Sequence, residues 1–101
     1  MNQPVDEVKA QLGDLATSLL NTLESGDQAK TLIAQQELTG TVTTLWNIRD
    51  EVDVDPKTKA ILRLVAGWVM NELPTQIQDP THHAEIKREL KLFQRSLMMF
   101  N

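Results

Sequence analysis

Residues 55–74 read DPKTKAILRLVAGWVMNELP and contain the stretch that decides the fold. Between the two prolines, apolar residues recur at intervals of three and four and cover most of the circumference of a helix. The opening Asp-Pro is a helix start, because aspartate caps a helix and proline fits its first turn. Pro74 favours an end at the preceding residue. We therefore expect a helix over 56–73, and we expect it to be the most buried one.

Three further segments show the same helical periodicity. The first covers residues 4–24, and the second covers residues 27–51 after the breaker Ser25-Gly26. The last covers residues 80–99 and has a regular apolar stripe, made of Ile86, Leu90, Phe93, Leu97 and Phe100. Short links force neighbouring helices to run in opposite directions. The sequence therefore predicts an all-α protein, a small antiparallel four-helix bundle, with residues 1–101 as a single domain.

The second segment has a weak point at residues 39–44, TGTVTT. Threonine and glycine both disfavour the interior of a helix, so either a kink or a break is compatible with this stretch. A β-strand over 39–45 is the competing interpretation. We reject the strand because the flanking periodicity is helical and no second strand exists to pair with it.

Composition excludes several classes of protein. The chain has 101 residues and no cysteine, which excludes a disulfide framework, thiol catalysis and cysteine-ligated metal sites. Its net charge of −4 is too small for a disordered acidic tail and has the wrong sign for a nucleic-acid grip by the whole protein. The longest apolar stretch, 61–70, is short and contains Arg63, so we expect no membrane span and a cytoplasmic protein.

Charge is distributed unevenly along the chain. Residues 1–55 carry ten acidic and three basic side chains, whereas residues 56–101 carry four acidic and seven basic side chains. The two halves either attract each other within the fold or steer a partner of complementary charge. We favour the first interpretation.

The residues capable of chemistry do not form a recognisable site. The acidic run 50–55 lacks the glycine and glutamate of a calcium-binding EF-hand loop, and the four glycines are too scattered for a phosphate-binding loop. His82 and His83 stand near Glu85, but no ligand set converges on them from the other segments. We therefore expect no metal, no cofactor and no enzymatic activity.

The end of the chain is the most distinctive feature. Leu97 is followed by three more apolar residues, Met98, Met99 and Phe100, which one helix face cannot bury together. Either Leu97 and Phe100 complete the internal stripe while the methionines cover a loop, or the group contacts a partner. Four basic residues lie on the outer face of the same segment, namely Lys87, Arg88, Lys91 and Arg95.

These observations favour a non-enzymatic module that binds another protein, as inhibitors, immunity proteins, chaperones and adaptors do. The expected contact residues are Arg88, Lys91, Arg95, Met98, Met99 and Phe100, with Asp50, Glu51 and Asp53 as a second, acidic surface. A homodimer is compatible with the same surface. The alternative is a small helical transcription regulator that contacts DNA through its last helix, which the acidic balance of the chain disfavours.

Overall fold

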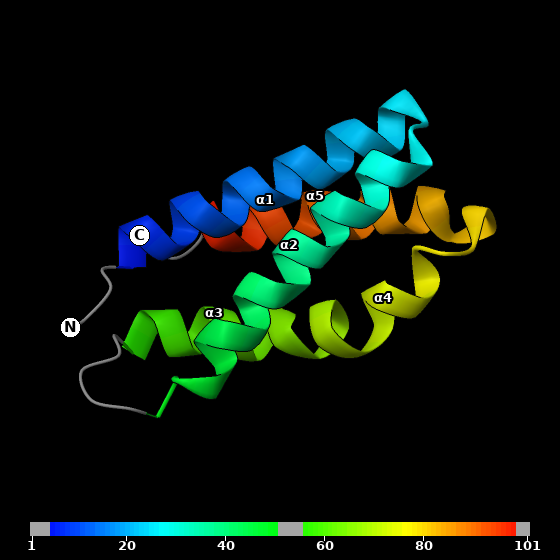
Figure 1. The fold of residues 1–101 in the computed structure, drawn as a ribbon. Helices are drawn as coiled ribbons and strands as arrows, with labels where there is room; N and C mark the ends of the chain where they lie inside the picture. The colour runs from blue at the N-terminus through cyan, green and yellow to red at the C-terminus, as the bar shows by residue number, and fades with distance from the viewer. Residues whose placement is uncertain (1–4, 51–55, 99–101) are drawn as a thin grey trace.

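The computed structural model describes residues 5–50 and 56–98, and every element within them is helical (Figure 1). The elements are α1 (Val5–Ser25), α2 (Gln28–Asn47), α3 (Pro56–Gly67), η1 (Trp68–Glu72), α4 (Leu73–Gln76), η2 (Pro80–His82) and α5 (His83–Met98). The π-helical turn η1 joins α3 to α4, so that the three form one long helix, and the 3₁₀ turn η2 leads into α5. Successive helices run in opposite directions, which confirms the predicted four-helix bundle.

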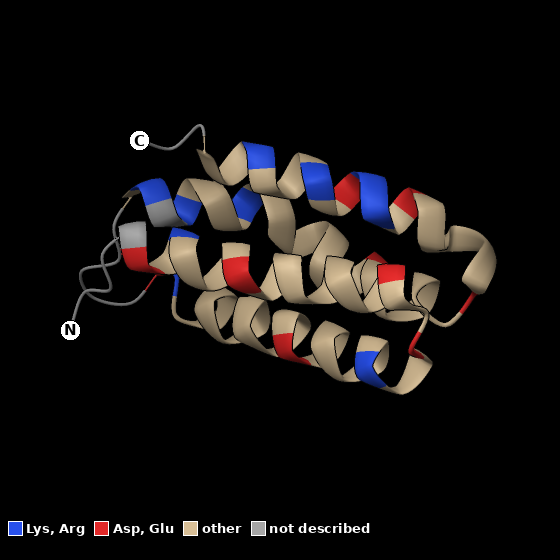
Figure 2. Cartoon of the chain, turned by 90° about the horizontal axis from the view of Figure 1, so that it is seen from above, with Lys and Arg blue, Asp and Glu red and all other residues tan. Residues whose placement is uncertain are grey.

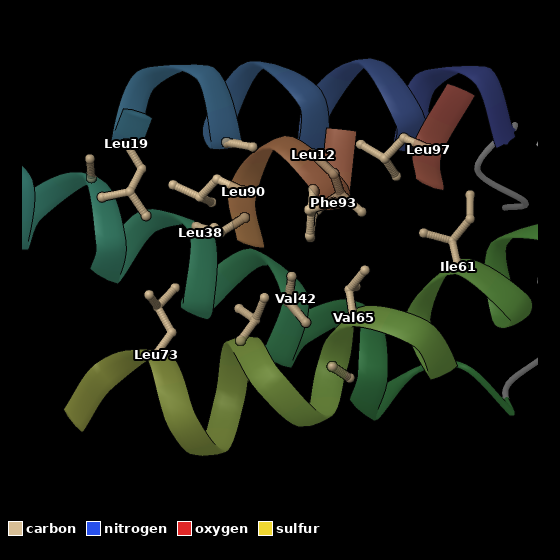
Figure 3. Close-up of a cluster of buried hydrophobic side chains, with 14 of the residues drawn as sticks. Leu12, Leu19, Leu38, Val42, Ile61, Val65, Leu73, Leu90, Phe93 and Leu97 are labelled. Carbon is tan, nitrogen blue, oxygen red and sulfur yellow. The ribbon is translucent and has the colours of Figure 1, made fainter. Parts of the chain in front are cut away.

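The core lies where the four helices meet. Helix α1 packs against α2 and α5, and the long helix α3–η1–α4 closes the bundle by contacting both α2 and α5. Side chains from all four helices point into this space, among them Leu12, Leu38, Val65 and Phe93 (Figure 3). Burial of a leucine or phenylalanine contributes roughly 1.5–3 kcal/mol, so this shared core is the main source of stability.

The long third helix contributes more buried apolar side chains than any other described element. They are Ile61, Leu62, Val65, Ala66, Val69 and Leu73. The helix is nevertheless not enclosed on all sides. Leu64 is 62% exposed, and Trp68 and Met70 are only partly buried. Its nearly continuous apolar surface therefore exceeds what the other three helices cover.

Helix α2 starts one residue later than predicted because Asp27 acts as its cap. Gly26, at a φ of 77°, takes the left-handed conformation that ends α1, and its N–H bonds to the carbonyl of Thr22. The Asp27 carboxylate then accepts a bond of 3.1 Å from the Lys30 N–H. Aspartate at this position satisfies a backbone donor that the first helical turn leaves free.

The threonine-rich stretch of α2 is continuous helix, with neither a break nor a strand. Thr43 Oγ1 donates to the Thr39 carbonyl at 2.7 Å, and Thr44 Oγ1 donates to the Gly40 carbonyl at 2.9 Å. These back-bonds give the hydroxyls partners within the helix. The helix ends at Asn47 rather than at 51. Just after this end, the Arg49 guanidinium lies 3.9 Å from the centre of the Trp46 ring and donates a hydrogen bond to the Trp46 backbone carbonyl.

The prediction that Pro74 ends the third helix was wrong, because the helix continues to Gln76. In the π turn before the proline, the Leu73 N–H bonds to the carbonyl of Trp68, five residues back. The Val69 carbonyl therefore loses Leu73 as its donor, and Pro74, the next residue, has no N–H. Thr39 of α2 supplies the missing donor, with its hydroxyl 3.2 Å from the Val69 oxygen.

Candidate functional site

Helix α5 presents a basic outer face. Its buried side holds the apolar stripe Ile86, Leu90, Phe93 and Leu97, which confirms the predicted orientation of the helix. Arg88, Lys91 and Arg95 are exposed on the other side and form no ion pair with another described residue. Seen from above, Lys and Arg gather along α5 and the first turns of α3, whereas Asp and Glu predominate along α1 (Figure 2). On α5 the basic side chains outnumber the acidic ones by four to two.

Met98, the last described residue of the predicted tail, is 71% exposed. Its neighbour Leu97 is 4% exposed, so the boundary between core and surface falls between these two side chains. Because α5 is continuous, the structure places Met98 on the same helix as Arg95 and Lys91. The two other predicted apolar contacts, Met99 and Phe100, lie outside the described residues.

A groove of about 500 Å³ lies between α1 and α5, and Met98 is one of the residues that line it. It is lined by Lys9, Ala10, Gly13 and Thr17 of α1 and by Gln94, Leu97 and Met98 of α5. The Gln94 amide donates to the Thr17 hydroxyl at 2.7 Å and so ties the two walls together. On the floor, Gly13 leaves room for a side chain, since a Cβ there would have only Leu97 Cδ1 within 4 Å, at 3.9 Å. We call this feature the α1–α5 groove.

A smaller groove of about 130 Å³ lies on the other flank of α5, against α3 and η1. Val65 and Phe93 line it, and the exposed Leu64 and Leu92 stand beside the half-buried Trp68. The sequence did not predict this surface, because the helix over 56–73, which contains Leu64 and Trp68, was expected to be the most buried one. The excess of apolar residues around 60–73 was the available signal for it.

Asp50 is the one residue of the predicted acidic surface that lies within the described part of the chain. Asp50 follows the end of α2, where its carboxylate lies 3.7 Å from Arg49 Nε and its side chain is 78% exposed. Glu51 and Asp53 lie outside the described residues. An exposed ion pair of this kind contributes at most about 1 kcal/mol, so Arg49 and Asp50 add little to stability.

The two histidines are engaged in local structure. Asp79 caps η2, with its carboxylate 3.0 Å from the Thr81 N–H and 2.8 Å from the Thr81 hydroxyl. These two bonds hold the pKa of Asp79 below its usual value of 3.8, and the bond from the backbone N–H has the largest effect. His82 lies 3.7 Å from Asp79 and 3.4 Å from Glu85, and His83 Nε2 lies 3.1 Å from the Ile77 carbonyl.

No group of three or more metal-ligating side chains is close enough to hold an ion within residues 5–50 and 56–98. The same residues include no helix with the length and apolar character needed to cross a membrane. Comparison of the chain with protein-family models, with curated proteins and with solved structures found no match.

Proposed function

We propose that the chain is a non-enzymatic protein-interaction module, of the inhibitor, immunity-protein, chaperone or adaptor type. Its docking face comprises the outer side of α5 and the α1–α5 groove. The observation that supports this proposal is the exposure of Met98, 71%, in the lining of a mainly apolar groove beside Lys91 and Arg95, which have no ion-pair partner among the described residues.

The fold leaves the apolar side chain of Met98 largely exposed to water. Removing a methionine side chain from water is worth roughly 1.5–3 kcal/mol, and a partner seated over Met98 would gain it on binding. Methionine suits such a contact because its unbranched thioether adapts to different shapes. Cations around an apolar contact add specificity and speed association with an acidic surface.

Site-specific photocrosslinking tests the proposal. The photoreactive amino acid p-benzoylphenylalanine replaces Met98 in one version of the full chain and Ile33 in another. Ile33 is a matched control, because it is 57% exposed and lies on α2 rather than on the docking face. Irradiation in the source cells is expected to give a discrete protein adduct from position 98 only.

The size of the adduct then identifies the type of partner. An adduct of two chains, each of 11.4 kDa, would show that the docking face joins two copies. A larger discrete adduct would show a different protein. Identical adducts from positions 98 and 33, or none from position 98, would contradict the proposed docking face.

DNA binding is the second candidate, favoured by the row of exposed cations at 88, 91 and 95. Contacts from these three side chains to phosphates predict that log K falls by about 2.7 for each tenfold rise in salt. Titration of a DNA duplex with the protein at two salt concentrations measures this slope. This function would be excluded if the protein does not bind the duplex, or if its affinity for the duplex does not change with salt.

A further inference from the structure

The α1–α5 groove combines a mainly apolar lining with cations on its α5 rim, and this combination indicates what it binds. We infer that the groove receives an acidic amphipathic helix of the partner protein. The inference rests on the proposed function and specifies the chemistry of the partner segment. Apolar side chains of the incoming helix lie in the groove, and its carboxylates face α5.

The floor of the groove fits a row of apolar side chains. Leu97 and Met98 line it from α5 beside Gln94, and Gly13 leaves room on the floor. A helix that binds in a groove inserts side chains spaced by three and four residues, and a volume of about 500 Å³ is large enough for several of them. The groove follows the helix axes, which suits an elongated segment.

The rim supplies the charge selectivity. Lys91 lies three residues before Gln94 and seven before Met98, so the three share the flank of α5 that borders the groove. Arg95 lies next to this flank, and neither cation has an ion-pair partner among the described residues. Glu89 belongs to the opposite flank, where it lines the smaller groove. Lys9 of α1 also lines the groove.

A second copy of the chain fits this face less well than an acidic helix does. In a two-fold dimer the same patch meets itself, so Lys91 and Arg95 of each copy would face a patch that carries the same two cations. Nucleic acid is also less favoured, because phosphate contacts would leave the apolar groove and Met98 without a role.

The test uses a fluorescent synthetic peptide of about four helical turns, with leucines at i, i+3, i+4 and i+7 and glutamates on both flanks. Two control peptides have lysine in place of every glutamate, or serine in place of every leucine. Fluorescence anisotropy measures the binding of each peptide to the full chain. We expect the acidic peptide to bind about tenfold more tightly than either control.

Variants of the protein locate the peptide in the groove. Lys91→Glu together with Arg95→Glu is expected to remove the preference for the acidic peptide, and Met98→Ser is expected to weaken its binding about fivefold. Lys30→Glu is the matched control, since Lys30 is exposed on α2, and it should leave affinity within about twofold. Circular dichroism of each variant verifies that the helices are intact.

Three results would overturn the inference. They are equal affinity for the acidic and basic peptides, acidic-peptide affinity unchanged in the charge-reversed protein, and tighter binding of a DNA duplex than of the acidic peptide. These results leave the proposed function standing if position 98 still crosslinks to a partner protein. Loss of that crosslink is instead evidence against the proposed function itself.

Discussion

Two regions of the molecule differ in which side chains they bury. One is the contact between α2 and the long third helix, and the other is the α1–α5 groove. At the first, polar side chains are buried: Gln35 is 5% exposed, and its amide donates to Thr39, which in turn donates to the Val69 carbonyl. At the second, the apolar Met98 is 71% exposed. At the first site these polar groups find hydrogen-bond partners within the fold. The second site leaves an apolar side chain exposed, which a partner could cover.

The largest expected effect separates two adjacent residues of the groove. Leu97→Ala should lower the free energy of unfolding by about 2–5 kcal/mol, because Leu97 is buried and its loss leaves a cavity. Met98→Ala should change it by less than about 0.5 kcal/mol, since that side chain is already in water. Urea denaturation followed by circular dichroism measures both values. A comparable loss in both variants would mean that the chain itself covers Met98.

An intermediate effect is expected at the buried polar contact. Thr39→Val keeps the shape of the side chain but removes the hydroxyl, and so leaves the Val69 carbonyl and the Gln35 amide without this partner. We expect a loss of about 1–3 kcal/mol in the free energy of unfolding. Thr44→Val is the control, because its hydroxyl is exposed and bonds only within α2.

A second substitution shows whether the cost at Thr39 originates at Pro74. In the Pro74→Ala background a backbone N–H becomes available to the Val69 carbonyl, so Thr39→Val should cost less there than in the original chain. The expected coupling is at least about 0.5 kcal/mol. Strictly additive losses in the double variant would disprove the link between the two positions.

The smallest effect concerns an exposed polar contact, the cap formed by Asp79. Its lowered pKa means that the ionised carboxylate stabilises the fold above the usual value of 3.8, and that this contribution disappears as the pH falls through the folded-state pKa. Asp79→Ala should therefore lower Tm slightly at pH 7, and the difference from the original chain should shrink in acid. A constant difference across the acid range would argue against the cap.

The fold followed from the sequence because its main signals are local. Apolar spacing and Asp-Pro starts locate the helices, and both can be recognised within a few turns of chain. The passage of the helix through Pro74 could not be predicted in this way. It depends on a hydroxyl at Thr39, in another helix, and on a π turn that no local pattern indicates.

The candidate site was predictable only in part. In the last segment, apolar residues recur at intervals of three and four. This helical spacing indicates that Arg88, Lys91 and Arg95 face away from the core. The grooves depend instead on how far apart neighbouring helices pack, which side-chain volumes from different elements determine together. Leu64 illustrates the difficulty, because the sequence cannot show which side of a mostly apolar helix remains uncovered.

The bond from Thr39 to the Val69 carbonyl also has a mechanical consequence. Apolar contacts between two helices tolerate small axial sliding, but this bond joins one hydroxyl to one oxygen at 3.2 Å. A slip by a single turn, about 5.4 Å, would separate them and leave the carbonyl of the buried Val69 without this donor. The bond therefore sets the lengthwise registration of the second helix against the third.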